Sequence, residues 1–350
     1  MCYERAISTE IRVANPILVE LTRGALVESV HRGAIAISDA EGRIVFALGD
    51  IALPVYPRSA LKPIQALPLL ESGAADAFHV SDEEIALACA SHSGEPMHTE
   101  RVGAWLARLG LGEQDLACGT HPVRHEPVAE EMIRRGEIPT RIHNNCSGKH
   151  TGFLTVARHW SIATAGYERH DHPVQHAVAK TLGELAGIAQ ELPWGVDGCA
   201  APNFAIPLGA FAHALAQFAD PQKLSPQRSQ AVRRICAAMI AHPELVAGTG
   251  RICTVLVRAG GGRVAVKTGA EGVFAAIVPE AGLGIALKID DGGGRAADTA
   301  IASLLGRMGL IDPDTARDLI HAPIRNTRNS ITGERRPAPA LMEATLPRLQ

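Results

Sequence analysis

A serine followed three residues later by a lysine opens the first segment that could do chemistry. Ser59-Ala60-Leu61-Lys62 comes after an extended, proline-marked stretch and begins a run with helical spacing. The spacing predicts that Ser59 lies at a helix start, with Lys62 one turn later on the same face. A serine hydroxyl becomes a good nucleophile only when a base accepts its proton, and a desolvated lysine can do so. The pattern indicates nucleophilic catalysis, unless Ser59 is only a helix cap and Lys62 a surface charge.

A second lysine and a second serine lie in contexts that suit the same site. Lys267-Thr268-Gly269 ends a predicted late strand. An early Ser-x-x-Lys, a helical block and a late Lys-Thr-Gly are the layout of penicillin-binding proteins and serine β-lactamases, so we expect a fold of that class. The polar cluster Ala90 to Glu95 follows an apolar run and could bring Ser91 into the same cleft. It could also be an ordinary capped turn before the next helix.

Two loops of small residues could supply metal ligands. One contains Cys146, Lys149 and His150, just before a helix predicted over 151–159, and the other contains Asp197 and Cys199. Two thiolates from separate loops, with an amine or imidazole, would give three tetrahedral ligands and leave one position for water or substrate. Because no Cys-x-x-Cys pair is present, the two cysteines could instead be buried apolar thiols.

The elements that must position these residues follow from the hydrophobic pattern. Strands are expected at both ends of the chain and helices between them. The terminal strands should pair into one antiparallel sheet, which gives an α+β fold in a single domain, 1–350. We expect a sheet lobe over about 1–58 and 245–350, and a helical lobe over about 59–244. The individual expectations are strands within 16–49 around a turn at 39–42, helices from 59 to about 241, strands at 252–257, 263–267, 272–278 and 284–289, and a helix at 295–308.

The composition excludes several classes of partner. The chain has 350 residues, 46% of them hydrophobic and 20% charged, and a formal charge of -3, so it can bury a large core. Without a basic run, neither a nucleic acid nor an anionic membrane is an expected partner, and a small molecule fits better. Seven cysteines are an odd number for a disulfide scaffold. The N-terminal segment lacks signal-peptide features, and no stretch reaches about 20 apolar residues, so we expect a cytoplasmic protein.

Five segments together resemble the Rhizobium etli type of L-asparaginase, over nearly the whole chain. They are Arg58 to Pro63, Ser91 to Glu95, Asn144 to His150, Asp197 to Pro202, and Lys267 to Gly269. The resemblance implies a serine β-lactamase-like fold and a homodimer. It also implies two catalytic pairs, Ser59 with Lys62 and Ser91 with Lys267.

The same resemblance implies a Zn²⁺ ion held by Cys146, Lys149 and Cys199, with Asp197 and His150 close by as substrate-binding residues. A lysine ligand must bind as the neutral amine, so the affinity for zinc should fall as protons compete at low pH. The ion could anchor the α-amino and carboxylate groups of the substrate, activate water or be structural. Of these roles we favour anchoring.

The expected reaction is hydrolysis of L-asparagine to aspartate and ammonia. Ser59, deprotonated by Lys62, would attack the side-chain amide, and water would release aspartate from the acyl-enzyme. Ser91 and Lys267 would relay protons or orient the amide, although the two serines could exchange roles. Alternatives are a glutaminase, a β-lactamase-like serine hydrolase or peptidase, and, in another class, a non-catalytic binding protein that zinc stabilises.

Overall fold

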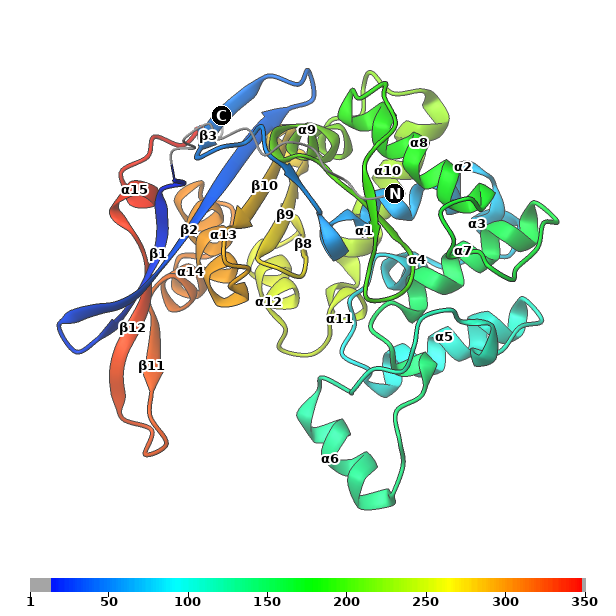
Figure 1. Cartoon of the computed structure of the whole chain (residues 1–350), viewed down its shortest axis with the longest axis horizontal. Coiled ribbons are helices and arrows are strands. Elements are labelled where there is room, and N and C mark those ends of the chain that lie inside the picture. The colour runs from blue at the N-terminus through cyan, green and yellow to red at the C-terminus, as the bar shows by residue number, and fades with distance from the viewer. Residues whose placement is uncertain (1–13, 348–350) are drawn as a thin grey trace, which may run out of the picture.

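An antiparallel sheet of eight strands forms one side of the molecule in the computed structural model, which describes residues 14–347 (Figure 1). The strands run in the order β11-β12-β1-β2-β10-β9-β8, and β3 also pairs with β2. Their bounds are β1 Ile17–Arg23, β2 Leu26–Asp39, β3 Ile44–Leu48, β8 Ala265–Thr268, β9 Val273–Val278, β10 Leu283–Ile289, β11 Ala322–Arg325 and β12 Ile331–Pro337. The first 13 residues of the expected sheet lobe, which include most of the segment inspected for a signal peptide, lie outside the described residues.

The centre of the sheet joins the two ends of the chain. Strand β2 pairs with β10 in unbroken register, from Gly33 opposite Ile289 to Asp39 opposite Leu283. Side chains alternate between the two faces, so that Ile35 belongs to one buried cluster and Ala36 to the other. The prediction that N- and C-terminal strands form one antiparallel sheet is therefore confirmed.

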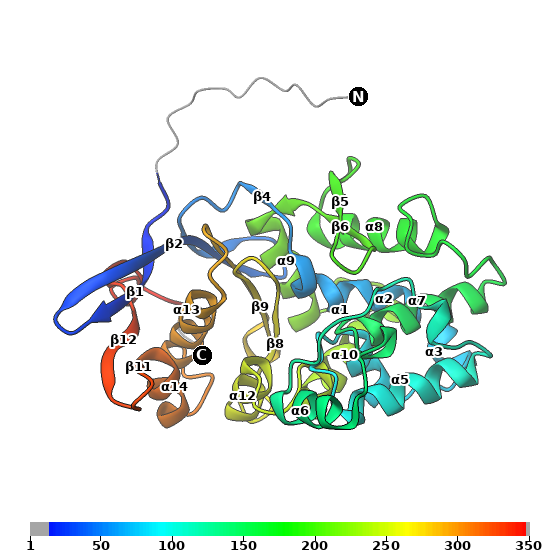
Figure 2. The same cartoon turned by 60° about the horizontal axis from the view of Figure 1, so that its bottom comes forward.

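Helices cover both faces of this sheet (Figure 2). On one face α12 (Ile252–Ala259) and α13 (Gly294–Arg307) pack with the larger aliphatic side chains. On the other face α9 (Leu208–Ala219) crosses β2, β9 and β10. It lies so close that a Cβ at Gly284 would be 2.2 Å from the Ala212 carbonyl oxygen, which explains the glycine.

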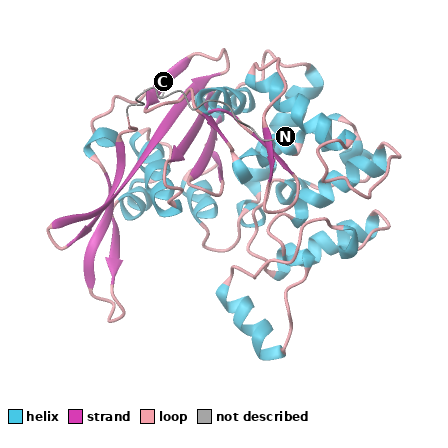
Figure 3. Cartoon of the chain, viewed as in Figure 1, coloured by secondary structure: helices cyan, strands magenta, loops and turns pink. Residues whose placement is uncertain are grey.

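Helices α14 (Pro313–Ile320) and α15 (Pro339–Met342) also pack on the sheet side, against α13 and β1 respectively. Ten further helices of residues 14–347 form a second lobe beside α9 (Figure 3). They are α1 Lys62–Gln65, α2 Leu67–Glu71, α3 Ala74–Ala77, α4 Asp82–Ala88, α5 Pro96–Arg108, α6 Glu126–Arg135, α7 Ser147–His159, α8 Pro173–Ala186, α10 Pro226–Ala241 and α11 Pro243–Val246. The short strands β5 (Trp194–Val196) and β6 (Pro202–Phe204) form a hairpin whose loop contains Cys199. Within the described part of the chain, no helix has the length and apolarity needed to cross a membrane.

One expected strand is a helix, and one pair of strands was not expected. Residues 252–257 are rich in β-branched side chains, but they form the start of α12. Its buried residues Cys253, Thr254, Leu256 and Val257 recur with helical spacing and pack on the sheet, so tertiary burial outweighs β propensity. The hairpin of β11 and β12 extends the sheet past β1 through a segment of mixed polarity, which hides the alternation on which the prediction depended. Helix α7 also begins earlier than expected, at Ser147.

Candidate active site

The hydroxyl of Ser91 lies between two lysine amines. Ser91 Oγ is 3.1 Å from Lys62 Nζ and 3.0 Å from Lys267 Nζ. Both lysines are buried, each with 1% of its surface exposed. Lys62 also donates to the Ala90 carbonyl, and Lys267 donates to the Thr268 carbonyl at 2.8 Å. Two buried amines that share one serine hydroxyl form a proton-transfer arrangement, which a structural core rarely contains.

Three separate elements bring these groups together. Ser91 follows the end of α4, and its backbone nitrogen donates to the Val246 carbonyl at 2.9 Å. Lys62 begins α1, after a 3₁₀ turn over Arg58–Leu61, and Lys267 is on β8. The end of β8 lies directly on that turn, because a Cβ at Gly269 would be 2.6 Å from the Pro57 carbonyl oxygen. Only glycine fits there, so close packing explains the glycine of the Lys-Thr-Gly segment.

Ser59 opens on a cavity of about 560 Å³ that Ser91 also lines. Within residues 14–347 no hydrogen bond joins Ser59 to Lys62, whose amine is directed to Ser91 instead. Ser59 is not the helix cap, since Pro57 occupies that position, and Lys62 is not a surface charge. The structure thus brings all four predicted catalytic residues to one place, with Ser91 contacting both lysines.

The electrostatics favour Lys267 as a base. Burial lowers the pKa of its amine from the usual 10.5 to about 7, and the charge of Lys62 acts in the same direction. The neighbouring thiol of Cys253 opposes this shift. A large fraction of Lys267 is therefore neutral near pH 7 and can accept a proton from Ser91.

A cluster of sulfur and nitrogen atoms lies behind Lys62. Lys62 Nζ is 3.1 Å from Cys146 Sγ, and Lys149 Nζ is 3.0 Å from Cys199 Sγ. Cys146, Lys149 and Cys199 are all buried. The hydrogen bond from Cys146, together with the Lys149 amine, holds the pKa of Cys199 well below its usual range, and the same bond to Cys199 and burial raise the pKa of Cys146. Of the two sulfurs, that of Cys199 loses its proton more readily.

The donor set fits a zinc ion. Two thiols and an amine converge from two loops, as predicted, and His150 adds an imidazole whose Nε2 is buried without a hydrogen-bond partner among the described residues. Burial lowers the pKa of His150, which keeps the ring neutral. No group of three or more His, Cys, Asp or Glu side chains in residues 14–347 is arranged as a metal site, but the predicted set counts a lysine as its third ligand. The zinc site stays a prediction.

The two residues expected to bind substrate have partners of their own. Asp197 Oδ1 accepts hydrogen bonds from Arg58 Nη2 at 2.8 Å and from the backbone nitrogen of Gly198 at 2.6 Å. This ion pair ties the loop of Cys199 to the turn of Ser59. His150 Nδ1 is 2.6 Å from the Tyr167 hydroxyl, so this nitrogen already has a hydrogen-bond partner within the protein. Both residues border the sulfur cluster, and a direct contact with substrate stays a prediction.

Sequence reasoning missed the charged residues on the sheet side of the cavity. Arg251 and Arg335 line it together with Asp298, and they come from α12, β12 and α13. Glu95 was also missed. Its carboxylate accepts from Ser93 Oγ at 2.5 Å and from the backbone nitrogen and hydroxyl of Thr249 at 2.9 and 2.6 Å. In the sequence, these charged residues lie on separate segments. Their common position becomes apparent only when the fold places those segments side by side.

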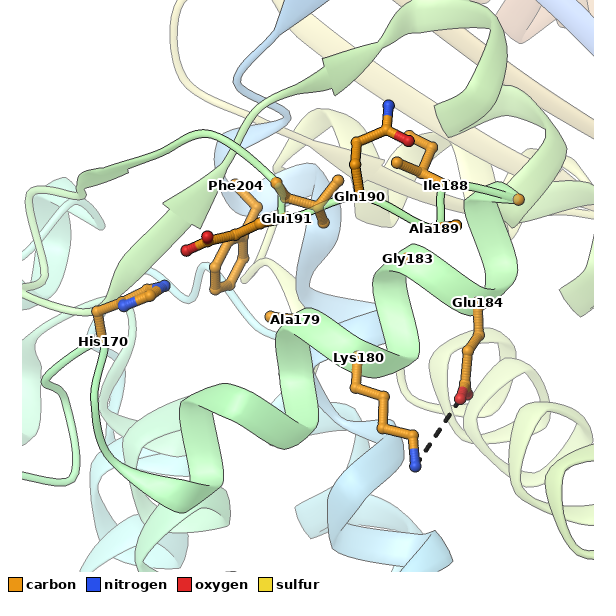
Figure 4. A pocket seen from close by; sticks show the side chains of 12 residues that line it. His170, Ala179, Lys180, Gly183, Glu184, Ile188, Ala189, Gln190, Glu191 and Phe204 are labelled. Carbon is orange, nitrogen blue, oxygen red and sulfur yellow. Dashed lines mark ion pairs between the residues drawn. The ribbon is translucent and has the colours of Figure 1, made fainter.

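Other hollows contain none of the predicted site residues. A cavity of about 510 Å³ lies between α8 and the loop that follows it, with Phe204 and His170 on its wall (Figure 4). Two charged residues on its wall, Lys180 and Glu184, lie one turn apart on α8 and pair with each other at 3.9 Å. Among the described residues that line this cavity there is no Ser, Cys or Thr, so it is a weaker candidate site than the cavity of Ser59 and Ser91.

The chain is similar to several solved structures at low sequence identity. No curated protein sequence matches the chain. Among solved structures, Mglu in its native form aligns with a TM-score of 0.46 and 14% identity, over 89% of this chain and 73% of that one. Mglu in its tris and glutamate form gives 0.45 and 14%, over 84% and 62%, so this chain spans less than two thirds of its length. A β-lactamase from Mycobacterium bovis gives 0.42 and 16%, over 79% and 94%.

The family comparison covers most of the chain. Residues 19–337 match the family described as L-asparaginase II. This span includes the serine turn, the Ser91 loop, both cysteine loops and the Lys-Thr-Gly strand. The chain therefore belongs to the L-asparaginase II family of amidohydrolases.

Proposed function

We propose that this protein hydrolyses the side-chain amide of L-asparagine to aspartate and ammonia by serine-lysine catalysis. The observation that carries the proposal is the position of Ser91 Oγ within 3.1 Å of Lys62 Nζ and 3.0 Å of Lys267 Nζ, beside a cavity open to a small molecule. The family supplies the amidohydrolase class. The Rhizobium etli type, the serine β-lactamase-like fold, the homodimer and the cytoplasmic location stay predictions.

Each catalytic group has a task in this proposal. Neutral Lys267 accepts the proton of Ser91 as its oxygen attacks the amide carbon, and Lys62 holds the hydroxyl in position through its hydrogen bond. The tetrahedral intermediate expels ammonia, which takes the proton back from Lys267. Water then hydrolyses the ester, with Lys267 again as the base, and releases aspartate. Ser59 shares the cavity and supplies a second hydroxyl near the amide.

The pairing expected from the sequence, Ser59 with Lys62, remains the alternative assignment. In that version Ser59 attacks, and Lys62 accepts its proton, which requires Lys62 to turn from Ser91 toward Ser59. The contacts of Lys62 with Ser91, Cys146 and the Ala90 carbonyl make such a turn costly, because three polar contacts would have to change. We therefore favour Ser91 as the nucleophile.

A zinc ion would be held by Cys146, Lys149 and Cys199. When bound, it would supply a Lewis acid that can orient the polar groups of the substrate. Lys62 contacts both Ser91 and Cys146, so the protein itself links the serine to this cluster.

Ammonia release from L-asparagine tests the function, and acyl-enzyme trapping tests the nucleophile. Ser91→Ala should lower turnover by a factor of about 10³ or more, since the attacking atom is lost. Acid quenching during turnover, followed by peptide mass spectrometry, should place the aspartyl ester on Ser91. An ester on Ser59, with Ser91→Ala retaining it, would reverse the two roles. Wild-type protein that releases no ammonia from L-asparagine would refute the proposed function.

A further inference from the structure

The cavity next to the two serines is strongly cationic on one side. Arg124, Arg251 and Arg335 all line it, and the only acid on its wall within residues 14–347 is Asp298. The arginines come from three distant segments: the loop before α6, the start of α12 and strand β12. Three guanidinium groups that converge on one cavity from such different places are a feature of the folded chain, since no basic run exists in the sequence.

Arg335 lacks a partner that a buried guanidinium nitrogen normally has, because its Nε is buried and has no hydrogen-bond partner in the part of the chain that the structure describes. Arg124 is more exposed, and its Nη2 is 3.4 Å from His121 Nε2. Burial lowers the pKa of both Arg335 and Arg124, and within residues 14–347 neither has a carboxylate hydrogen-bonded to it. Leaving a buried charged donor unpaired is costly, which favours an anion from outside the chain.

Asp298 does not neutralise the cluster. Burial raises its pKa to about 6, although the charges of Arg335 and Arg251 act against that rise. At pH 7 it therefore supplies at most one negative charge against three positive ones. In addition, Gly294 at the start of α13 and Ile252 at the start of α12 line the same cavity, so two helix N-termini add to the positive potential.

We propose that Arg251, Arg335 and Arg124 bind the α-carboxylate of the amide substrate, with Asp298 available for its α-ammonium group. The inference rests on the proposed function, because it places the amide carbon at Ser91 and the rest of the same amino acid across the cavity. The substrate class is an amide with a free carboxylate. In this arrangement the arginines that line the cavity bind the carboxylate, and the predicted metal ligands are left free of it.

A pair of substrates that differ only in the carboxylate isolates this contact. L-Asparagine has the group, and β-alaninamide is the same molecule without it. Arg251→Met and Arg335→Met keep most of the apolar stem, and each should lower kcat/KM for L-asparagine by about 10- to 100-fold, as expected for a lost charge-assisted hydrogen bond. The kcat/KM for β-alaninamide should stay within about 2-fold of its wild-type value. Arg134→Met on exposed α6 is the control, and it should change neither value.

Calorimetric titration with L-aspartate gives a readout that needs no turnover. The wild type should bind it, and Arg251→Met and Arg335→Met should each weaken binding by at least 10-fold. Equal loss of activity on both substrates, unchanged aspartate affinity in both variants, or no binding by the wild type would each overturn the carboxylate site. Aspartate binding that requires the arginines, in a wild type that releases no ammonia, would support this site and refute the proposed function. If Arg335→Met fails to fold, Arg335→Lys should show the same selective loss to a smaller degree.

Discussion

Lys267→Met should make the protein more stable and almost inactive. The amine of Lys267 is buried, with 1% of the residue exposed, and within residues 14–347 its hydrogen-bond partners are Ser91 Oγ and the Thr268 carbonyl. Neither partner is a carboxylate, so the protonated form of Lys267 is a cation that the folded environment does not compensate. Methionine has a similar stem and no charge, and it removes the base of the proposed mechanism.

The size of the effect follows from the pKa of this amine. A fall from the usual 10.5 to about 7 corresponds to about 5 kcal/mol, at about 1.4 kcal/mol per pKa unit. The unfolded chain holds a proton between pH 7 and 10.5 that the folded chain has lost, so stability falls as the pH falls through this window. The full penalty is present below pH 7. Methionine removes the penalty but loses two hydrogen bonds worth about 1 kcal/mol each, which leaves a net gain of about 3 kcal/mol.

The assay combines ammonia release with the melting temperature, each measured from pH 6 to pH 9.5. The variant should melt several degrees above the wild type at pH 6 to 7, and the difference should shrink as the pH rises. Lys223→Met is the matched control, since Lys223 is exposed and pairs with Glu41 on the surface. A variant with wild-type turnover would show that Lys267 is not the base. A difference in melting temperature that does not depend on pH would show that its pKa is not lowered.

Three further predictions concern the metal ligands, the pH dependence of stability and the loop contacts. Cys146→Ser and Cys199→Ser should each remove about one zinc ion per chain in elemental analysis, whereas Cys236→Ser should not, since burial alone accounts for the raised pKa of Cys236. The melting temperature should fall as the pH drops below 6.5, because burial lowers the pKa of His98 and protonation then favours the unfolded chain. The neutral ring of His98 accepts a hydrogen bond from the Glu95 backbone nitrogen and donates one to the Glu244 carbonyl at 2.8 Å. His98→Gln should flatten that dependence, and an unchanged slope would rule out this imidazole as the cause. Glu95→Ala should cost about 2 to 4 kcal/mol by chemical denaturation, since it leaves the Thr249 amide unpaired; a loss under about 1 kcal/mol would show that the two loops hold each other without it.

The sequence predicted which side chains lie close together better than it predicted their pairing. Ser59 and Lys62 are linked by spacing, so a helical face suggested that they form one unit. In the folded chain, however, the Lys62 amine contacts the Ser91 hydroxyl, the Ala90 carbonyl and the Cys146 sulfur, which come from other segments. These contacts, and not the local spacing, direct Lys62 to Ser91. A contact between residues 29 apart in the chain is not encoded in a local pattern.

Arg251 and Arg335, which line the cavity, show a second limit of prediction from the sequence alone. Arg251 precedes a segment that was expected to be a strand and is α12, and Arg335 lies on a strand that was not expected. Because neither element was predicted correctly, the sequence could not show that the two residues line the same cavity. Arg335 lies between two other charged residues and Arg251 between Gly250 and Ile252, and a charge in such a setting indicates only a solvated surface. Their role becomes visible once β12 is paired with β1 and the start of α12 faces the same space.

Lys62 connects the two predicted motifs, the serine-lysine site and the cysteine cluster. Its amine contacts the Ser91 hydroxyl at 3.1 Å and the Cys146 sulfur at 3.1 Å, so one group contacts both the proposed nucleophile and the expected metal cluster. Any change in the charge of Cys146, whether by loss of a proton or by metal binding, alters the electrostatic potential at the Lys62 amine in a buried environment where screening is weak. A change in the contact of Lys62 with Cys146 is therefore expected to change its hydrogen bond to Ser91 as well. The two motifs therefore cannot be independent sites, and a substitution at Cys146 should alter the reactivity of Ser91 even if the metal never touches the substrate.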